Sequence, residues 1–201
     1  MKTLLIASSN PGKLREFQAI LQDVGINLIL PADIGVSLQV EEDGVDYYQN
    51  ALKKAIAYAQ ASGLITLADD SGLEVDALDG APGLYSARYS PKTGANDADR
   101  RAYLLQQLVK FPRPWPAHFH CTSVVALPSG EHFSFEGNCP GEIVDVERGE
   151  NGFGYDPIFL LPERGLTMAQ LPEEEKNRIS HRGRATLAAL PTLKKLLETE
   201  N

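Results

Sequence analysis

A short apolar run, Leu64–Ala68, leads directly into two adjacent carboxylates, Asp69 and Asp70. Its apolar and β-branched residues predict a buried strand, which we expect to end at the acidic pair. Ser71 and Gly72 follow at once and allow the backbone to bend away. Acids at the end of a buried strand suit a metal ion held over a polyanion. An ordinary turn is the alternative interpretation, because Asp, Ser and Gly are common turn residues.

Strand-like and helix-like segments alternate in the first half of the chain. Residues 3–7 predict a buried strand, and apolar side chains then recur at helical spacing from Pro11 up to Gly25. A second helix is predicted from about Asp46 to a stop at Gly63, and a third from Asn96. Alternation of this kind indicates an α/β fold.

A strand meander is predicted in the second half. Residues 118–127 alternate as a half-buried strand, and Ser129-Gly130 suggests a hairpin turn. The segment 73–78 is expected to pair with the Leu64 strand, and a further strand is expected near Ile143–Val146. Together these segments predict a mixed sheet with flanking helices, in one domain over residues 1–201 with two lobes.

The charge balance restricts the possible partners. The chain has 201 residues and a formal net charge of -8. An acidic protein is a poor non-specific ligand for nucleic acid or for an anionic membrane, although a small anion can still bind in a local basic pocket. Two cysteines make no disulfide framework, and no apolar segment is long enough to span a membrane. We therefore expect a cytoplasmic protein with neither nucleic-acid nor membrane partners.

A polar loop, Ser8–Lys13, joins the first strand to the first helix. The N–H groups at a helix N-terminus attract phosphate, and Lys13 adds a positive charge there. The spacing of a Walker A motif is absent, so the loop taken alone is a weak signal. Glu41 and Glu42 lie in an acidic loop further along and would reach a metal at Asp70 only if the fold brought them together. The alternative for both is a solvated loop.

Aromatic, acidic and basic residues gather near the C-terminus, in Phe153–Asp156 and in Lys176 with Ser180–Arg182. A purine needs an aromatic face to stack on and polar groups along its edge. Each residue also has an ordinary interpretation: Phe153 as core, His181 as a surface histidine, and Arg182 as a helix cap.

Taken together, these stretches resemble the inosine triphosphate pyrophosphatase family over nearly the whole chain. The matching motifs occur in family order. They are SSNPGK at Ser8–Lys13, EDG at Glu42–Gly44, NALKKA at Asn50–Ala55, ADDSGLEVDAL with GAPGLYSARY, GFGYDPIF at Gly152–Phe159 and EKNRISHRGRA at Glu175–Ala185.

The resemblance implies a twisted mixed sheet in two lobes around a central cleft, and a homodimer. It implies Mg²⁺-dependent hydrolysis of ITP, dITP and XTP at the α–β phosphate bond, which keeps these nucleotides out of DNA and RNA. Glu42 and Asp70 would be metal-associated, Asp70 would also accept the proton of the attacking water, and Asp69 would assist. The implied substrate-binding residues are Ser8, Ser9, Asn10, Pro11, Gly12, Lys13, Lys54, Ser71, Phe153, Gly154, Tyr155, Asp156, Lys176, His181 and Arg182.

Two other functions stay open at this point. One is a related nucleotide pyrophosphatase that prefers modified pyrimidines or acts on nucleoside triphosphates in general. The other is a nucleotide-binding sensor or nucleic-acid partner without catalysis. The acidic charge disfavours nucleic acid, and the intact Asp69-Asp70 pair disfavours an inactive protein.

Overall fold

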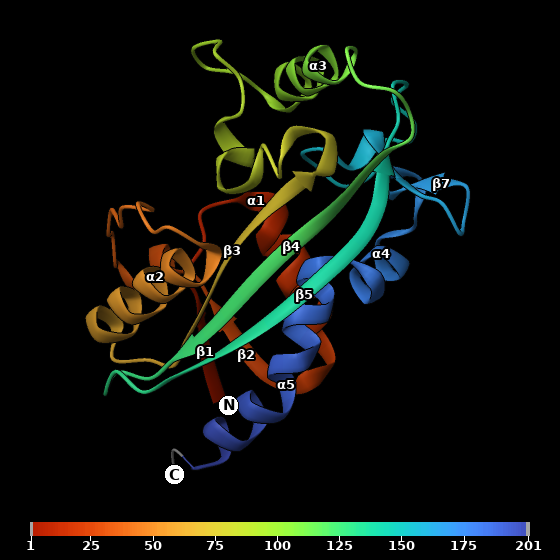
Figure 1. Ribbon diagram of the computed structural model, residues 1–201. Coiled ribbons are helices and arrows are strands. Elements are labelled where there is room, and N and C mark those ends of the chain that lie inside the picture. The colour runs from red at the N-terminus through yellow and green to blue at the C-terminus, as the bar shows by residue number, and fades with distance from the viewer. Residues whose placement is uncertain (1, 200–201) are drawn as a thin grey trace. The chain divides into compact units, whose positions relative to one another are not determined.

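Seven strands form one sheet in the computed structural model, which describes residues 2–199 (Figure 1). Their order is β2-β1-β3-β4-β5-β6-β7. β1 pairs in parallel with β2 and β3, whereas β5, β6 and β7 pair antiparallel. The sheet is mixed and helices flank it, which confirms the predicted α/β fold. The strands are β1 (Lys2–Ile6), β2 (Ile26–Ile29), β3 (Thr66–Val75), β4 (Trp115–Ala126), β5 (His132–Ile143), β6 (Phe159–Leu161) and β7 (Leu166–Thr167).

Polar caps explain where the first three α-helices begin, close to the predicted starts. The side chains of Asn10, Asp46 and Asn96 accept hydrogen bonds at the N-termini of α1, α2 and α3, and Gly63 ends α2 in the left-handed conformation. Among the described residues, none of the helices has the length and apolarity that crossing a membrane requires. The α-helices are α1 (Pro11–Leu21), α2 (Tyr47–Ser62), α3 (Asp97–Leu108), α4 (Glu173–Ile179) and α5 (His181–Thr199).

Strand β3 is longer than predicted. It does not end at the acidic pair but runs through residues 69–72 to Val75, so a separate strand over residues 73–78 is wrong. β3 lies between β1 and β4 in the sheet, and its pairing with β4 outweighs the local turn preference of Asp, Ser and Gly. The pairing of β1 with β3 stops at Ile6 and Leu67, so the two acids lie just past it.

The long hairpin strands also differ from the prediction. The expected strand near Ile143–Val146 is wrong, because β5 continues without a break from His132 to Ile143. β4 was expected to be half-buried, yet its residues 121–126 are all buried. Both faces of this central strand are covered, which removes the alternation typical of a one-sided sheet.

The chain divides into two compact units. The first contains the residues up to Asp70, Cys121–Gly137 and the segment from His181 onward. The second contains Ser71–His120 and Asn138–Ser180. The single domain with two lobes stays a prediction.

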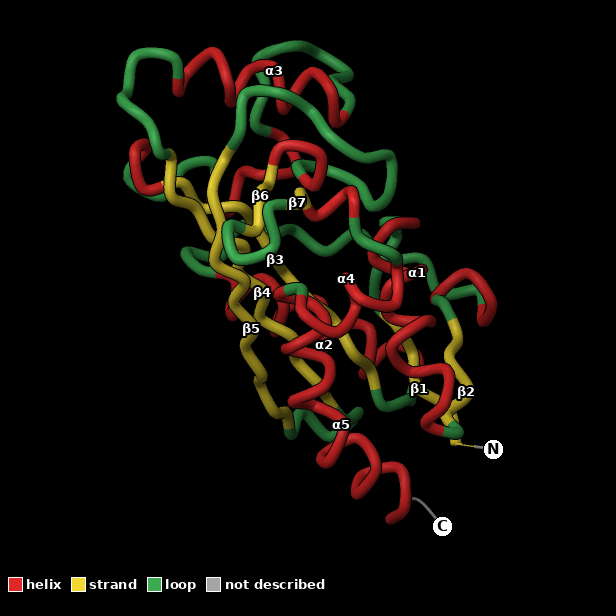
Figure 2. Tube along the Cα trace, turned by 90° about the vertical axis from the view of Figure 1, so that its right-hand side faces the viewer, coloured by secondary structure: helices red, strands yellow, loops and turns green. Residues whose placement is uncertain are grey.

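Helices α1 and α5 cover one face of the strands in the first unit and pack against each other (Figure 2). Phe17 and Leu21 of α1 and Leu193 of α5 share a buried cluster with Leu4 and Ile6 of β1. Successive strand residues point to opposite faces, so Leu4 and Ile6, two positions apart on β1, both point into this cluster. The packing fixes the start of α1, and with it Lys13, against the sheet.

Helix α2 covers the opposite face of the same unit (Figure 1). It presents Ala51, Ala55 and Ala59 to Ala7 and Ala68, and all five are buried. Small side chains let the helix approach the sheet closely. Polar residues on α2 therefore come within reach of the acids at 69 and 70.

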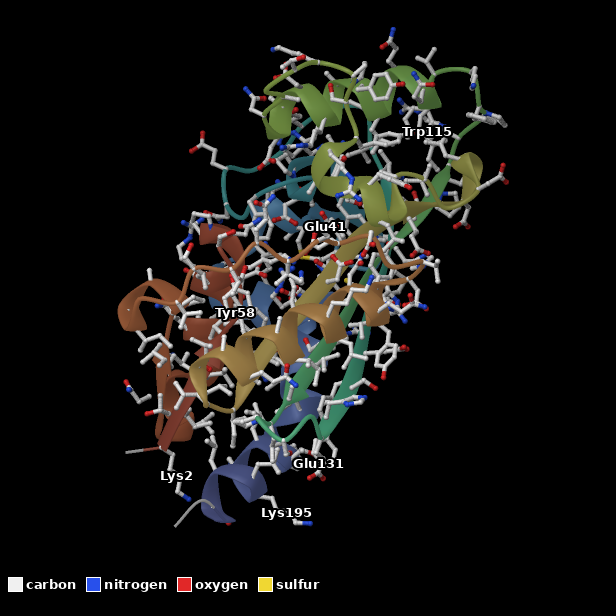
Figure 3. The ribbon with its side chains drawn as sticks, turned by 90° about the vertical axis from the view of Figure 1, so that its left-hand side faces the viewer. Lys2, Glu41, Tyr58, Trp115, Glu131 and Lys195 are labelled. Atoms are coloured by element: carbon white, nitrogen blue, oxygen red, sulfur yellow. The ribbon has the colours of Figure 1, made fainter. Side chains whose placement is uncertain are left out.

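The second unit has its own core, built between α3 and the other halves of the long strands. Leu104 and Leu108 of α3 share it with Trp115, Phe119 and Phe159. Trp115, labelled in Figure 3, is 3% exposed and packs in this core.

Candidate active site

Asp69 lies in the first unit at the centre of a group of buried charges. It is 1% exposed, and its Oδ2 lies 3.0 Å from Lys13 Nζ and 3.0 Å from Arg182 Nε. Burial alone would raise the pKa of Asp69, but the charges of Lys13, Arg182 and Lys54 together hold this pKa far below its ordinary value. Asp69 is therefore an ionised carboxylate throughout the physiological pH range.

Arg182 joins Asp69 to Glu16, a residue that the sequence reasoning missed. The Arg182 guanidinium is fully buried at the start of α5, and it donates to the carboxylates of Asp69 and Glu16. Glu16 is 4% exposed on the buried side of α1. The sequence feature that could have revealed Glu16 is its position three residues after Lys13, which places both side chains on one helix face. Contact of Arg182 with the nucleoside stays a prediction.

Asp70 has a different environment from its neighbour. It is 8% exposed, and its Oδ2 accepts a hydrogen bond from Asn50 Nδ2 at 2.9 Å. Burial raises the pKa of Asp70, and the negative charge of Glu42 adds to the rise. The charges of Lys54 and Lys13 and the Asn50 hydrogen bond offset this only in part, so the pKa lies above its ordinary value. Two adjacent carboxylates thus have pKa values displaced in opposite directions.

Lys54 of α2 connects the acidic loop to β3. Its Nζ donates to the Glu42 carboxylate and, at 2.7 Å, to the Asp69 carbonyl oxygen. Burial lowers the pKa of Lys54, but the charges of Asp69, Glu42 and Asp70 outweigh this effect and raise it. Residues from two separate segments, Glu42 and the pair at 69–70, are therefore held around one ammonium group.

The loop that carries Glu42 is fastened to α2 at several points. Gly44 N–H donates to Asn50 Oδ1 at 2.7 Å, and Tyr58 Oη donates to the Leu38 carbonyl at 3.0 Å. Figure 3 labels Tyr58 on α2 and Glu41 on this loop. Glu41 is exposed, whereas Glu42 is half-buried. The loop thus turns one of its two adjacent glutamates toward Lys54.

The donor set of this region fits a hard divalent cation. Glu42 and Asp70 offer carboxylate oxygens, and the charge of Glu42 already acts on Asp70. Mg²⁺ takes one or two protein carboxylates and completes its coordination with water and substrate phosphate. In the described part of the chain, no group of three or more His, Cys, Asp or Glu residues forms a metal site. Two carboxylates are nevertheless the usual protein share for Mg²⁺.

The predicted phosphate loop lies at the start of α1. Asn10 Oδ1 accepts hydrogen bonds from the N–H groups of Gly12, at 2.9 Å, and Lys13, at 3.3 Å. The cap therefore uses part of the donor capacity that the sequence reasoning assigned to phosphate. Ser9 and Pro11 are exposed. The Lys13 ammonium, held by Asp69, is the strongest anion-binding group of this loop.

The second unit contains the predicted aromatic loop, residues 152–156. Asp156 Oδ2 accepts hydrogen bonds from Phe153 N–H at 2.8 Å and from Lys176 Nζ at 2.6 Å. Lys176 Nζ also lies 4.9 Å from the centroid of the Phe153 ring. Tyr155 is buried and donates its hydroxyl to the Ser86 carbonyl at 2.9 Å. Phe153, Asp156 and Lys176 thus form one contact group, beside which Tyr155 packs into the core.

The remaining predicted residues divide between the units. Ser8 is half-buried and accepts a hydrogen bond from Asn10 N–H at 3.2 Å. His181 is buried at the first position of α5, in the first unit. Ser71 is half-buried on β3, in the second unit.

Comparison with known proteins places the chain in a family. The model of the Ham1 family matches residues 4–192. The chain belongs to the Ham1 family. It is 49% identical over 186 residues to the dITP/XTP pyrophosphatase of Geobacter sulfurreducens, covering 92% of this chain and 93% of that protein. It is 43% identical over 200 residues to the Bacillus subtilis protein of the same name, covering 98% of each.

Solved structures of Ham1 proteins share the fold. The HAM1 protein of Coxiella burnetii superimposes with a TM-score of 0.84 at 40% identity, covering 98% of this chain and 99% of that one. The nucleoside-triphosphatase / dITP/XTP pyrophosphatase of Mycobacterium abscessus gives 0.73 at 42% identity, covering 95% and 99%. Membership of the Ham1 family agrees with the resemblance read from the motifs.

Proposed function

We propose that this chain hydrolyses non-standard purine nucleoside triphosphates (ITP, dITP and XTP) to the monophosphate and pyrophosphate. The observation that carries the proposal is the arrangement around two adjacent carboxylates: Asp69 is ion-paired with Lys13 and Arg182, whereas Asp70 is oriented by Asn50. The pKa values of the two carboxylates are displaced in opposite directions, as suits a permanently charged group beside one that can exchange a proton. The dITP/XTP pyrophosphatase relatives support the same reaction.

Asp70 is the proton acceptor for the attacking water in this mechanism. A raised pKa makes its carboxylate a stronger base than an ordinary aspartate. The hydrogen bond from Asn50 fixes one oxygen and so sets the direction of the other. Asn50 is in turn held by Gly44 N–H, so the base is oriented by a chain of hydrogen bonds from α2 and its preceding loop.

Asp69 holds the cations that meet the phosphates. Its ionised carboxylate fixes Lys13 from one direction, while Arg182, which also binds Glu16, fixes Asp69 from another. Lys13 and Lys54 then neutralise the charge that develops on the leaving pyrophosphate. A positioned ammonium is effective there because the buried surroundings screen it less than water does.

Glu42 and Asp70 are the residues that would hold Mg²⁺. When bound, the ion supplies charge neutralisation at the phosphate oxygens. Lys54 contacts Glu42 and therefore belongs to the same electrostatic group.

The purine is assigned to the contact group of Phe153, Asp156 and Lys176. The Phe153 ring offers a stacking face, and Lys176 offers a donor beside it. Donors that face a 6-oxo group reject adenine, because a 6-amino group would leave buried donors unpaired at about 1–3 kcal/mol each. His181 and Arg182 stay predictions for this pocket, as do the homodimer and the cytoplasmic location.

Chromatographic product analysis tests the proposal directly. ITP, XTP, GTP and ATP are incubated with the protein, each with and without Mg²⁺. The expected result is inosine or xanthosine monophosphate with pyrophosphate, only when Mg²⁺ is present, and much slower turnover of GTP and ATP. Release of inorganic phosphate from ITP would contradict the assigned bond, and faster turnover of dTTP or UTP would favour the broader pyrophosphatase.

A further inference from the structure

One turn of helix α3 binds both backbone groups of Gly154, its N–H and its carbonyl. Asp97 Oδ2 accepts a hydrogen bond from Gly154 N–H at 2.8 Å, and Arg101 Nη1 donates to the Gly154 carbonyl at 2.8 Å. Asp97 and Arg101 are four residues apart and share a face of the helix. The two side chains thus close on the backbone of the loop, immediately after Phe153.

Both arms of this clamp are themselves anchored. Glu147 binds Arg101 through two hydrogen bonds, from Nε at 2.8 Å and from Nη2 at 2.9 Å. Asp97 Oδ1 accepts from Arg100 Nη1 at 2.6 Å. A paired guanidinium has a fixed plane, so Arg101 presents its remaining N–H in one direction.

The loop itself depends on glycine for this conformation. Gly154 has a φ of +62°, a region that strains other residues, although a side chain there would meet no atom within 4 Å. At Gly152 the φ is +76°, and an added Cβ would lie 2.1 Å from Asp156 Oδ2 and 2.9 Å from Lys176 Nζ. A backbone with such freedom needs external restraint before it can present Phe153 in one orientation.

We propose that Asp97 and Arg101 are positioning residues that set the orientation of the Phe153 ring by clamping Gly154. They act through the loop and contact neither purine nor phosphate. The inference rests on the proposed function, which assigns the purine to Phe153, Asp156 and Lys176. Its consequence is specific: loss of the clamp weakens nucleoside binding and discrimination between bases, while turnover of the bound substrate stays nearly unchanged.

Kinetics of ITP and GTP hydrolysis and calorimetry of IMP binding test the clamp in Asp97→Ala. We expect KM for ITP and Kd for IMP to rise about tenfold, with kcat within about twofold of wild type. The preference for ITP over GTP should fall with them. Asp97→Asn should restore most of the affinity, because an amide oxygen can still accept from Gly154 N–H.

Asp99→Ala is the matched control. Asp99 lies in the same first turn of α3, but its carboxylate accepts from Asn96 N–H at 3.0 Å and pairs with Lys92 instead of Gly154. We expect its KM for ITP to match wild type. Equal losses in Asp97→Ala and Asp99→Ala would overturn the clamp, because general loosening of α3 would then explain both.

Two further measurements distinguish the possible outcomes. If Asp97→Ala does not fold, Arg101→Met tests the other arm, and a KM equal to wild type would overturn the inference. Wild-type protein that neither hydrolyses ITP nor binds IMP would instead contradict the proposed function. Wild-type activity combined with an unchanged Asp97→Ala would contradict the clamp alone.

Discussion

The charged group of the first unit and the glycine-rich loop of the second are held by different means. Around Asp69, side chains hold side chains: Lys13, Arg182 and Glu16 form buried ion pairs on helices and a central strand. In the loop at residues 152–156, side chains mainly hold backbone groups, beside one buried ion pair between Asp156 and Lys176. Substitutions in the first group should therefore affect catalysis, triphosphate binding and folding stability, and substitutions in the second should affect nucleoside affinity and base preference.

The largest effect should come from Asp70→Asn. The amide can keep a hydrogen bond with Asn50 but cannot accept a proton, so kcat for ITP should fall about 10³-fold, within the range for loss of a general base. The melting temperature should change little. Asp43→Asn, an exposed acid in the Glu42 loop paired with Lys53, is the control and should keep wild-type kcat. Turnover of Asp70→Asn within a few-fold of wild type would remove Asp70 from the role of base.

Arg182→Met should be the most destabilising substitution. It leaves Asp69 and Glu16 buried with one fewer cation, and breaking a buried pair costs about 3–5 kcal/mol of unfolding free energy. Urea unfolding measures the loss. Lys53→Met removes an exposed pair of the same unit, and its unfolding curve should overlay that of wild type. Similar curves for the two variants would mean that the buried network is not structural.

Lys13→Ala tests whether the two regions bind different parts of the ligand. Loss of a charge-assisted contact to phosphate should weaken binding of a non-hydrolysable ITP analogue roughly 10- to 100-fold, but IMP less than about threefold. Lys176→Met should weaken both ligands to the same degree, because both carry the base. Equal losses of the two ligands in Lys13→Ala would refute its contact with the outer phosphates.

The smallest expected effect is a shift in the pH dependence of kcat/KM in Lys54→Met. The base must be ionised, so kcat/KM for ITP should fall as pH drops through the pKa of Asp70, above the ordinary aspartate value of 3.8. The charge of Lys54 lowers this pKa, so its removal should move the acid limb to higher pH. Lys53→Met, which changes the neighbouring residue of α2, should leave the limb in place. An acid limb that moves equally in both variants would contradict the assignment.

Local patterns predicted the helices well and the long strands poorly. The caps Asn10, Asp46 and Asn96 act within a few residues, so they are readable in sequence. By contrast, β3 passes through Asp-Asp-Ser-Gly because it pairs with β4, which is distant in sequence and which no local preference reports. β5 tolerates Gly137 because α5 packs there: an added Cβ would lie 2.1 Å from the His181 carbonyl oxygen.

In the candidate site, too, local features were predicted from the sequence and contacts between distant residues were missed. Lys13 and the two aspartates are readable locally, as a lysine at a helix start and as acids after a strand, whereas Lys54 was named through the family resemblance. Glu16 was missed because its partner Arg182 is 166 residues away along the chain. Asp97 and Arg101 were missed for a similar reason, since they act on a backbone group more than fifty residues further on, and no side-chain pattern marks such a contact.

The position of bond cleavage tests the central claim most directly. ITP is hydrolysed by the wild-type protein in water enriched in ¹⁸O, and both products are analysed by mass spectrometry. If Asp70 directs water at the α-phosphorus, the label enters IMP and pyrophosphate stays unlabelled. Label in pyrophosphate or in inorganic phosphate would contradict the mechanism.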